Sequence, residues 1–401
     1  MRLTRLDAFL IRVLYAMAAL IVILQVLDQD ALVSMVFYAS FAVALALWLS
    51  AVCQKMELLD AVVLAAIAIA LINVLLNAIS ANAALSFQYL KKYIIFAVTL
   101  LLFAAADKLR ISTAVGHWIN RTMTLASIAM TLTFFWKGQE LYEMHGIVSN
   151  YLTFHFTNPN LVGLFLFCLA VYQFILLLYE HDLKRKLFHG VLFMFMAVFI
   201  LKTQSRNALL SLAVFLAIAV SMFRLNKRTV TVKKWACAFI AAWPLLFAGL
   251  YMQLYGNNVV GRMLSFVVSE GKLLDSRVKM WRFAMRWYKT SPVVGAYDQI
   301  TEGLGAGQMH NTHIDILAAY GPMVLALVCI ILYMLMRRGA ANATRHPLYV
   351  IAFMCTIVMG MGEAALFGGS LGLYIFAVGF LLLSNMQQEE PSPSEAEVDA
   401  P

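Results

Sequence analysis

Three short polar segments interrupt an otherwise apolar chain, and their residue types suit the binding of phosphate and the transfer of a proton. The first contains Arg206, the second contains Arg277, and the third places His310 and Asn311 after a glycine-rich run. The planar guanidinium of arginine stays charged and binds phosphate oxygens through two parallel hydrogen bonds. A neutral imidazole near pH 7 can accept a proton. Whether these side chains act together depends on the elements that carry them.

Composition places these segments in a membrane protein. Of the 401 residues, 63% are hydrophobic and 13% are charged, whereas a soluble domain has about 45–50% apolar and about 25% charged residues. The mean hydropathy is +0.81. The five cysteines lie in apolar stretches without the spacing of metal ligands, so we expect small buried side chains and no disulfide framework.

Apolar runs set the predicted architecture, because a spanning helix needs about 20 mostly apolar residues. Several runs are short and must borrow flanking residues to cross. We predict an all-α polytopic membrane protein with about 12 transmembrane helices, forming a single transmembrane domain over residues 1–385. The predicted spans are Ala8–Leu27, Ala31–Cys53, Ala61–Ile79, Tyr93–Ala106, Met123–Trp136, Leu161–Tyr179, Gly190–Leu201, Asn207–Phe223, Trp235–Leu254, Ile314–Met336, Leu348–Phe367 and Leu371–Ser384.

Basic residues predict the orientation, because lysine and arginine mark the cytoplasmic loops of membrane proteins. With a cytoplasmic N-terminus, every basic cluster in a short loop falls on the cytoplasmic side, except Lys91–Lys92 and the turn that holds Lys202 and Arg206. The net charge of +9 is mostly this topology signal, and we see no nucleic-acid motif. Residues 386–401 are acidic and rich in proline and serine, so we expect a disordered cytoplasmic tail.

One long connection, over residues 256–313, carries cations on the predicted outer side, where few are expected. Within it, the segment Ser276–Tyr288 repeats apolar residues at steps of three and four, which predicts a helix. We expect this amphipathic helix to lie at the membrane surface with an aromatic anchor and a basic face that attracts an anionic head group or substrate. The cations of the connection are Arg262, Lys272, Arg277, Lys279, Arg282, Arg286 and Lys289.

The order and spacing of these residues closely resemble the O-antigen ligase and polymerase superfamily. The resemblance covers most of the chain, including the predicted twelve spans. A single dominant outer loop makes the chain more similar to the ligases than to the polymerases, and the chain is short for a protein O-oligosaccharyltransferase. It departs from the family at Val324, where another small residue is common. The motifs are Arg206 with Leu210, Ser276-Arg277 followed by Trp281, Ser291-Pro292 and Gly295, His310-Asn311 ahead of Gly321, and Asn158-Pro159-Asn160.

The resemblance implies a GT-C-like membrane fold with a periplasmic loop in the bacterial inner membrane. It also implies an enzyme that transfers O-antigen polysaccharide from undecaprenyl diphosphate to the lipid A–core oligosaccharide, at the periplasmic face, during lipopolysaccharide biosynthesis. The reaction in the superfamily is metal-independent, and direct attack on the anomeric carbon inverts its configuration. No cofactor is expected. The expected partners are the lipid-linked donor, the lipid A–core acceptor and membrane lipids, with no nucleic acid.

Roles for individual residues follow from this resemblance. Arg206 and Arg277 would hold the leaving diphosphate, and His310 would take the proton of the attacking hydroxyl. Asn311 would orient His310 or bind a sugar, and Glu363 in the eleventh span would pair with an arginine or a sugar hydroxyl. Further substrate-binding candidates are Lys91, Lys92 and Arg282.

Each role has a simpler alternative. Arginine and lysine at span ends often anchor a helix at the interface, and this would account for Arg206 and for Lys91 with Lys92. Arg277 can belong to the lipid-facing basic face, and His310 can be an ordinary polar residue at a helix start. Glu363 can be a solvated residue at the membrane boundary.

Metal sites and other functions also remain open. Asp28 and Asp30 have the spacing of a metal-binding pair, but a polar turn between two spans explains them, and a metal shared by His310 and His313 lacks carboxylate partners at ligand spacing. The alternative functions are an O-antigen polymerase and, from another class, a transporter of an anionic substrate. A transporter predicts charges spread along the spans and broken helices near the midplane.

Overall fold

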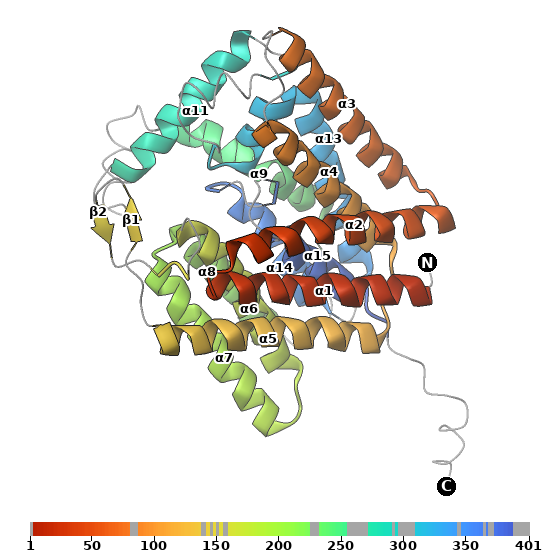
Figure 1. Cartoon of the computed structure of the whole chain (residues 1–401), viewed down its shortest axis with the longest axis vertical. Helices are drawn as coiled ribbons and strands as arrows, with labels where there is room; N and C mark the ends of the chain where they lie inside the picture. The colour runs from red at the N-terminus through yellow and green to blue at the C-terminus, as the bar shows by residue number, and fades with distance from the viewer. Residues whose placement is uncertain are drawn as a thin grey trace.

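The computed structural model is a bundle of helices (Figure 1). It describes residues 3–80, 87–137, 142–144, 147–149, 152–154, 159–224, 232–254, 272–290, 293–295, 309–342, 346–363, 366–367 and 373–387. Most of the predicted outer loop and all of the predicted tail after residue 387 lie outside these residues. The described residues form thirteen helices and one short antiparallel hairpin of β1 (Tyr142–Met144) and β2 (Ile147–Ser149). The helices are α1 (Arg5–Val26), α2 (Asp30–Gln54), α3 (Leu58–Ser80), α4 (Phe87–Lys108), α5 (Thr113–Lys137), α6 (Pro159–Tyr179), α7 (Leu183–Thr203), α8 (Arg206–Arg224), α9 (Lys234–Leu254), α11 (Lys272–Thr290), α13 (Thr312–Asn342), α14 (Pro347–Met359) and α15 (Leu373–Ser384).

Eight of these helices are long and apolar enough to cross a membrane, so the chain is a multi-pass membrane protein. They are α1, α2, α3, α4, α6, α7, α9 and α13. Three other apolar helices, α8, α14 and α15, are shorter. Each predicted apolar run overlaps a helix, with α5 covering the run Met123–Trp136. The number of twelve spans stays a prediction.

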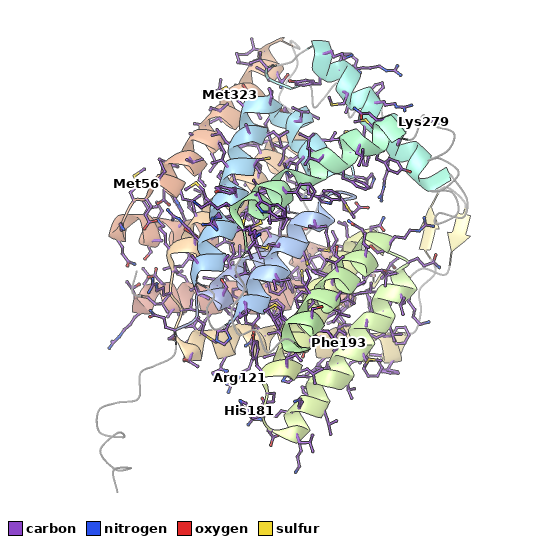
Figure 2. All side chains as sticks on the ribbon, turned by 180° about the vertical axis from the view of Figure 1, so that it is seen from behind. Met56, Arg121, His181, Phe193, Lys279 and Met323 are labelled. Carbon is purple, nitrogen blue, oxygen red and sulfur yellow. The ribbon has the colours of Figure 1, made fainter. Side chains whose placement is uncertain are left out.

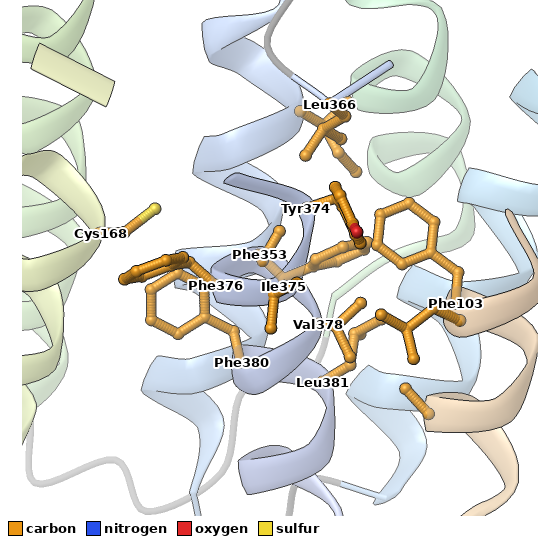
Figure 3. Close-up of a cluster of buried hydrophobic side chains, with 14 of the residues drawn as sticks. Phe103, Cys168, Phe353, Leu366, Tyr374, Ile375, Phe376, Val378, Phe380 and Leu381 are labelled. Atoms are coloured by element: carbon orange, nitrogen blue, oxygen red, sulfur yellow. The ribbon is translucent and has the colours of Figure 1, made fainter. Parts of the chain in front are cut away.

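The helices α14 and α15 form the centre of the bundle (Figure 1), and they are buried on nearly every side. A helix that is apolar all round must be surrounded by other helices or by lipid. Aromatic rings fill the space around this pair (Figure 3), and the ring of Phe103 meets that of Phe353 edge to face. Two buried tyrosines link α15 to neighbouring helices through hydrogen bonds. Tyr15 of α1 donates to the carbonyl of Ile375, and Tyr172 of α6 donates to that of Phe376.

The end of α14 differs from the predicted span Leu348–Phe367. The helix stops at Met359, and residues 360–363 form a turn instead. The amide of Thr312, the first residue of α13, donates to the carbonyl of Gly360 at 2.8 Å, so the turn is fixed to the neighbouring helix. The hydropathy of the run did not reveal this end, because residues on both sides of the turn are apolar. The turn carries Glu363.

The helix α13 is broken about a third of the way from its start rather than continuous as predicted. Gly321 has a φ of +81°, and Pro322 after it has no amide hydrogen to donate. The break leaves backbone carbonyls without helical partners, and side chains of α3 and α4 take them. Asn73 donates to the carbonyl of Tyr320 at 2.6 Å, and the hydroxyl of Tyr89 donates to that of Ala319. Such substitutes are required where backbone bonds are lost inside a membrane.

Residues 293–295, which include Gly295, pack directly on this break. A side chain at Gly321 would meet the carbonyl of Val293, and one at Gly295 would meet the carbonyl of Ala318. Both glycines have a positive φ, which residues with a Cβ rarely adopt. Asn77 of α3 also donates to the carbonyl of Val294 at 3.0 Å. The backbone of the loop therefore touches the backbone of α13 where both lack side chains.

The amphipathic helix predicted over Ser276–Tyr288 is confirmed as part of α11, but its aromatic anchor is in the protein rather than in lipid. Trp281 is fully buried beside Phe247 and Tyr251 of α9, and its indole nitrogen donates to the carbonyl of Met309 at 2.8 Å. An amphipathic pattern shows that one face is buried but does not distinguish lipid from protein as the partner. Lys279 lies on the opposite, exposed face (Figure 2).

Charged side chains gather at the far end of α13. Arg338 binds both Glu57 and Asp107, at 2.7 and 2.6 Å. Lys108 pairs with Asp60 at 2.9 Å and is buried with it. This end is the predicted cytoplasmic side, and the site described below lies near the other end of the same helix.

Candidate functional site

Glu363 is the centre of a buried cluster that unites three segments of the chain. One carboxylate oxygen lies 2.7 Å from a guanidinium nitrogen of Arg277 in α11, and the other lies 2.9 Å from Nδ1 of His310. The Glu363 side chain is 1% exposed, whereas those of Arg277 and His310 are 17% and 27% exposed. The predicted pairing of Glu363 with an arginine is confirmed. The side chains of Arg277 and His310 therefore contact a buried carboxylate while parts of both stay exposed.

The contact with Glu363 determines which nitrogen of His310 is free. An ionised carboxylate only accepts hydrogen bonds, so Nδ1 must carry the hydrogen and donate it. In the neutral ring, Nε2 is then left with a lone pair. A carboxylate in this position also stabilises the imidazolium that forms when Nε2 takes a proton. The arrangement is that of an oriented general base.

The backbone at His310 is held in an uncommon conformation. Its φ is +47°, in the left-handed region that is costly for residues with a Cβ. Such strain persists where the surrounding structure fixes it, and it is frequent at functional sites. Asn311 supplies part of this restraint, because its side-chain oxygen accepts from the amides of His313 and Ile314 and so caps α13. Its side-chain nitrogen donates to the carbonyls of Pro244 and Met361.

Thr312 completes the attachment of this segment to the turn after α14. Its hydroxyl donates to the backbone carbonyl of Glu363 at 3.0 Å, and its amide donates to that of Gly360. The segment that carries His310 and the turn that carries Glu363 are thus fixed to each other through both backbone and side chains. The distance between base and carboxylate does not depend on one contact alone.

Arg206 is the first residue of α8 and directly follows a tight turn, whereas the prediction placed it in the turn itself. The preceding helix ends at Thr203, and Gln204 has a φ of +53°. Arg206 is exposed, whereas the next residue, Asn207, donates to the carbonyl of Met359. A Cβ added to Gly362 would lie 3.3 Å from both the Asn207 amide nitrogen and Nη1 of Arg277. The start of α8 therefore reaches the turn that holds Glu363.

The three other predicted residues, Lys92, Lys91 and Arg282, contact residues other than Glu363. Lys92 forms a buried ion pair with Asp315 at 2.7 Å. The ammonium of Lys91 lies 5.8 Å above the ring of Tyr38. Arg282 is on the exposed face of α11, and it donates to the carbonyl of Met252. In α11, the guanidinium of Arg277 pairs with Glu363. A substrate-binding role for Lys91, Lys92 and Arg282 stays a prediction.

Two pairs of residues were considered as metal ligands, His310 with His313 and Asp28 with Asp30. Nε2 of His313 lies 2.7 Å from the carbonyl of Ala241 and the ring is buried, so His313 does not share a site with His310. Asp28 and Asp30 lie in an exposed turn between α1 and α2. Over the described part of the chain, no group of three histidine, cysteine or acidic side chains is placed to hold a metal ion.

Three contributors were absent from the residues predicted for the site. Asp315, Thr312 and Asn207 support it through hydrogen bonds to the backbone. Their positions give a partial signal, because each directly follows or lies within one turn of a predicted site residue. An acidic residue inside an apolar run, such as Asp315, is itself a reason to expect a function.

The geometry suits one kind of chemistry: the removal of a proton by His310 close to the guanidinium of Arg277. No protein-family model matches the chain, and no curated protein matches it.

Proposed function

We propose that the protein is a glycosyltransferase, an O-antigen ligase that moves the O-antigen from undecaprenyl diphosphate to the lipid A–core oligosaccharide. The observation that carries this proposal is the carboxylate of Glu363, which binds Arg277 and His310 at once. It supports the proposal because a cation and an oriented base are the two groups that the reaction requires. The resemblance of the motifs to the superfamily supplies the substrate class.

In the proposed reaction, His310 acts on the acceptor. Nε2 takes the proton of a sugar hydroxyl while that oxygen attacks the anomeric carbon of the donor. The bond between this carbon and the diphosphate oxygen breaks, and undecaprenyl diphosphate leaves with the bonding electrons. Direct attack inverts the configuration of the anomeric carbon. Glu363 stabilises the imidazolium that results.

Arg277 and Arg206 act on the donor in this proposal. Negative charge develops on the diphosphate as the sugar leaves, and fixed guanidinium groups lower the energy of that charge without reorganisation. Arg277 is suited to this because Glu363 fixes its orientation while part of its side chain stays accessible. Arg206 is suited to it because it is exposed at the start of α8, next to Asn207, which contacts the same turn.

The proposed location is the bacterial inner membrane, with the site at the periplasmic face. The lipid-linked donor and the lipid A–core would then both reach the site from the bilayer. The charged cluster of Arg338, Glu57 and Asp107 at the far end of α13 supports this orientation, since basic residues favour the cytoplasmic side.

The decisive test uses the purified protein, a polyprenyl-diphosphate-linked glycan and lipid A–core. We expect transfer by the natural protein and a loss of about 10²- to 10⁴-fold with His310→Ala, because a general base contributes that factor. Donor binding should persist in this variant, since the base acts on the acceptor.

The matched control is His346→Ala, a histidine before α14 whose ring packs on Tyr179 and Tyr349. It should leave transfer unchanged. The reactions are run in EDTA, and activity that disappears there and returns with Mg²⁺ would contradict the metal-independent mechanism and redirect attention to Asp28 and Asp30.

An O-antigen polymerase is the alternative with the same chemistry and another acceptor. A lipopolysaccharide gel of a deletion strain separates the two. Loss of a ligase leaves bare core, whereas loss of a polymerase leaves core that carries one repeat.

A transporter of an anionic substrate is the alternative from another class, and two observations favour it. The break of α13 at Gly321 and the buried pair of Lys92 and Asp315 are features that transporters share. Uptake of the lipid-linked glycan into inside-out vesicles that survives His310→Ala would support the transporter, and absence of uptake with active transfer would support the ligase.

A further inference from the structure

A buried ion pair supports the segment that carries His310. The ammonium of Lys92 in α4 lies 2.7 Å from one carboxylate oxygen of Asp315, and the two side chains are 7% and 2% exposed. The other oxygen of Asp315 accepts from the amide of Met309 at 3.2 Å. Asp315 thus connects a cation in one helix to the residue that directly precedes His310.

Both neighbours of His310 are fixed by such contacts. Met309 is held at its amide by Asp315 and at its carbonyl by Trp281, and Asn311 is held by its cap on α13. His310 between them has the left-handed φ of +47°. A strained residue keeps its conformation only while its surroundings determine it. Releasing the amide of Met309 would allow His310 to relax to an ordinary conformation and move away from Glu363.

The buried position of Lys92 is explained by the negative charge of Asp315 beside it. A carboxylate without a counter-charge is costly inside a membrane domain. Lys92 supplies that charge from α4, and its ammonium is directed at Asp315 within the protein interior. This differs from the predicted role of Lys92 in binding the donor.

We propose that Asp315 is a positioning residue, which holds the backbone at Met309 so that His310 meets Glu363, and that Lys92 is its counter-ion. The inference rests on the proposed function for its effect on catalysis, but its effect on the position of His310 is independent of any activity.

Two double variants separate this proposal from a donor-binding role of Lys92. Lys92→Met with Asp315→Asn removes both charges but keeps an oxygen that can accept from Met309. Lys92→Met with Asp315→Leu removes the same charges and the acceptor, at similar size. We expect the first to keep kcat within a few-fold of the natural protein, and the second to lose about 10- to 100-fold in kcat with an unchanged KM for the donor.

Other outcomes overturn the proposal. If both variants raised the donor KM alike, Lys92 would act on the donor. If both kept kcat, the contact of Asp315 with Met309 would not position the base.

A measurement without substrate keeps the proposal testable by itself. Diethyl pyrocarbonate modifies accessible histidines, and peptide mass spectrometry of the full chain gives the rate at His310, whose side chain is 27% exposed. We expect this rate to change in the variant with Asp315→Leu and to stay the same in the variant with Asp315→Asn. Buried His313 should stay unmodified in both, which reports that the fold is intact. Equal rates at His310 in all three proteins would overturn the positioning role, whether or not the protein transfers glycans.

Discussion

At the scale of residues, the site depends on one carboxylate that contacts both an arginine and a histidine. Glu363 has one oxygen on Arg277 and the other on His310, and its backbone carbonyl accepts from Thr312. Because the side chain is almost completely buried, its charge is screened little by water. A change at Glu363 should therefore affect the base and the cation together.

We predict that Glu363→Gln lowers kcat about 10- to 100-fold, the usual effect of losing a residue that orients a functional histidine. The amide keeps the size of the side chain but loses the charge that stabilises imidazolium. Steady-state kinetics of the purified protein measure the effect. Glu363→Asp, which keeps the charge on a shorter side chain, should retain more activity than Glu363→Gln. The reverse order would show that shape, and not charge, is what Glu363 provides.

The resemblance singled out Arg277 and His310, and the cost of a carboxylate in an apolar span singled out Glu363. The structure places these three side chains in contact. The supporting contacts were only partly predictable. The resemblance suggested that Asn311 orients His310, but a sequence does not mark the backbone groups that Asn311 and Asp315 contact. Nor can spacing show that Lys92 meets Asp315, since the two are far apart in the chain and pair only in the folded bundle.

At the scale of elements, apolar length predicted where helices lie but not where they break. The runs that became α13 and α14 are apolar on both sides of their interruptions. A hydropathy average treats Gly321 as a neutral residue, whereas its backbone conformation redirects the helix. Similarly, the period of α11 identified its buried face but not the protein surface that covers it.

We predict that Gly321→Ala destabilises the protein, because holding a residue with a Cβ at φ +81° and ψ 177° costs about 1–3 kcal/mol. The added Cβ would also clash with the carbonyl of Val293. Thermal unfolding followed by fluorescence-detected size exclusion measures the change. Gly249→Ala in α9 is the matched control, since nothing lies within 4 Å of its added Cβ. That change should be neutral or slightly stabilising, and equal melting temperatures for all three proteins would contradict a structural need for glycine at 321.

At the scale of the whole molecule, the candidate site and the ion pairs of Arg338 lie at opposite ends of α13. The cluster around Glu363 lies near its start, and the ion pairs of Arg338 lie near its end. The sequence predicted this polarity through the positions of its lysines and arginines. It did not give the number of helices that cross completely, because α8, α14 and α15 are shorter than a usual span.

We predict opposite membrane sides for α11 and for the start of α7. In a variant without the five natural cysteines, Lys279→Cys should react with an impermeant maleimide in intact spheroplasts. Lys184→Cys, equally exposed in the fold, should react only after the membrane is opened. Gel-shift labelling measures both, and labelling of the two positions from the same side would refute the proposed orientation.

The backbone contact at Gly295 and Gly321 determines how the attachment of this segment responds to salt. Residues 293–295 are held against α13 by direct contact between two peptide backbones and against α3 by the side-chain amide of Asn77, and none of these contacts carries a net charge. Dissolved ions weaken attractions between charges but not steric fit. These contacts should therefore persist equally well in dilute and in concentrated salt, even though the opposite face of α11 carries exposed cations.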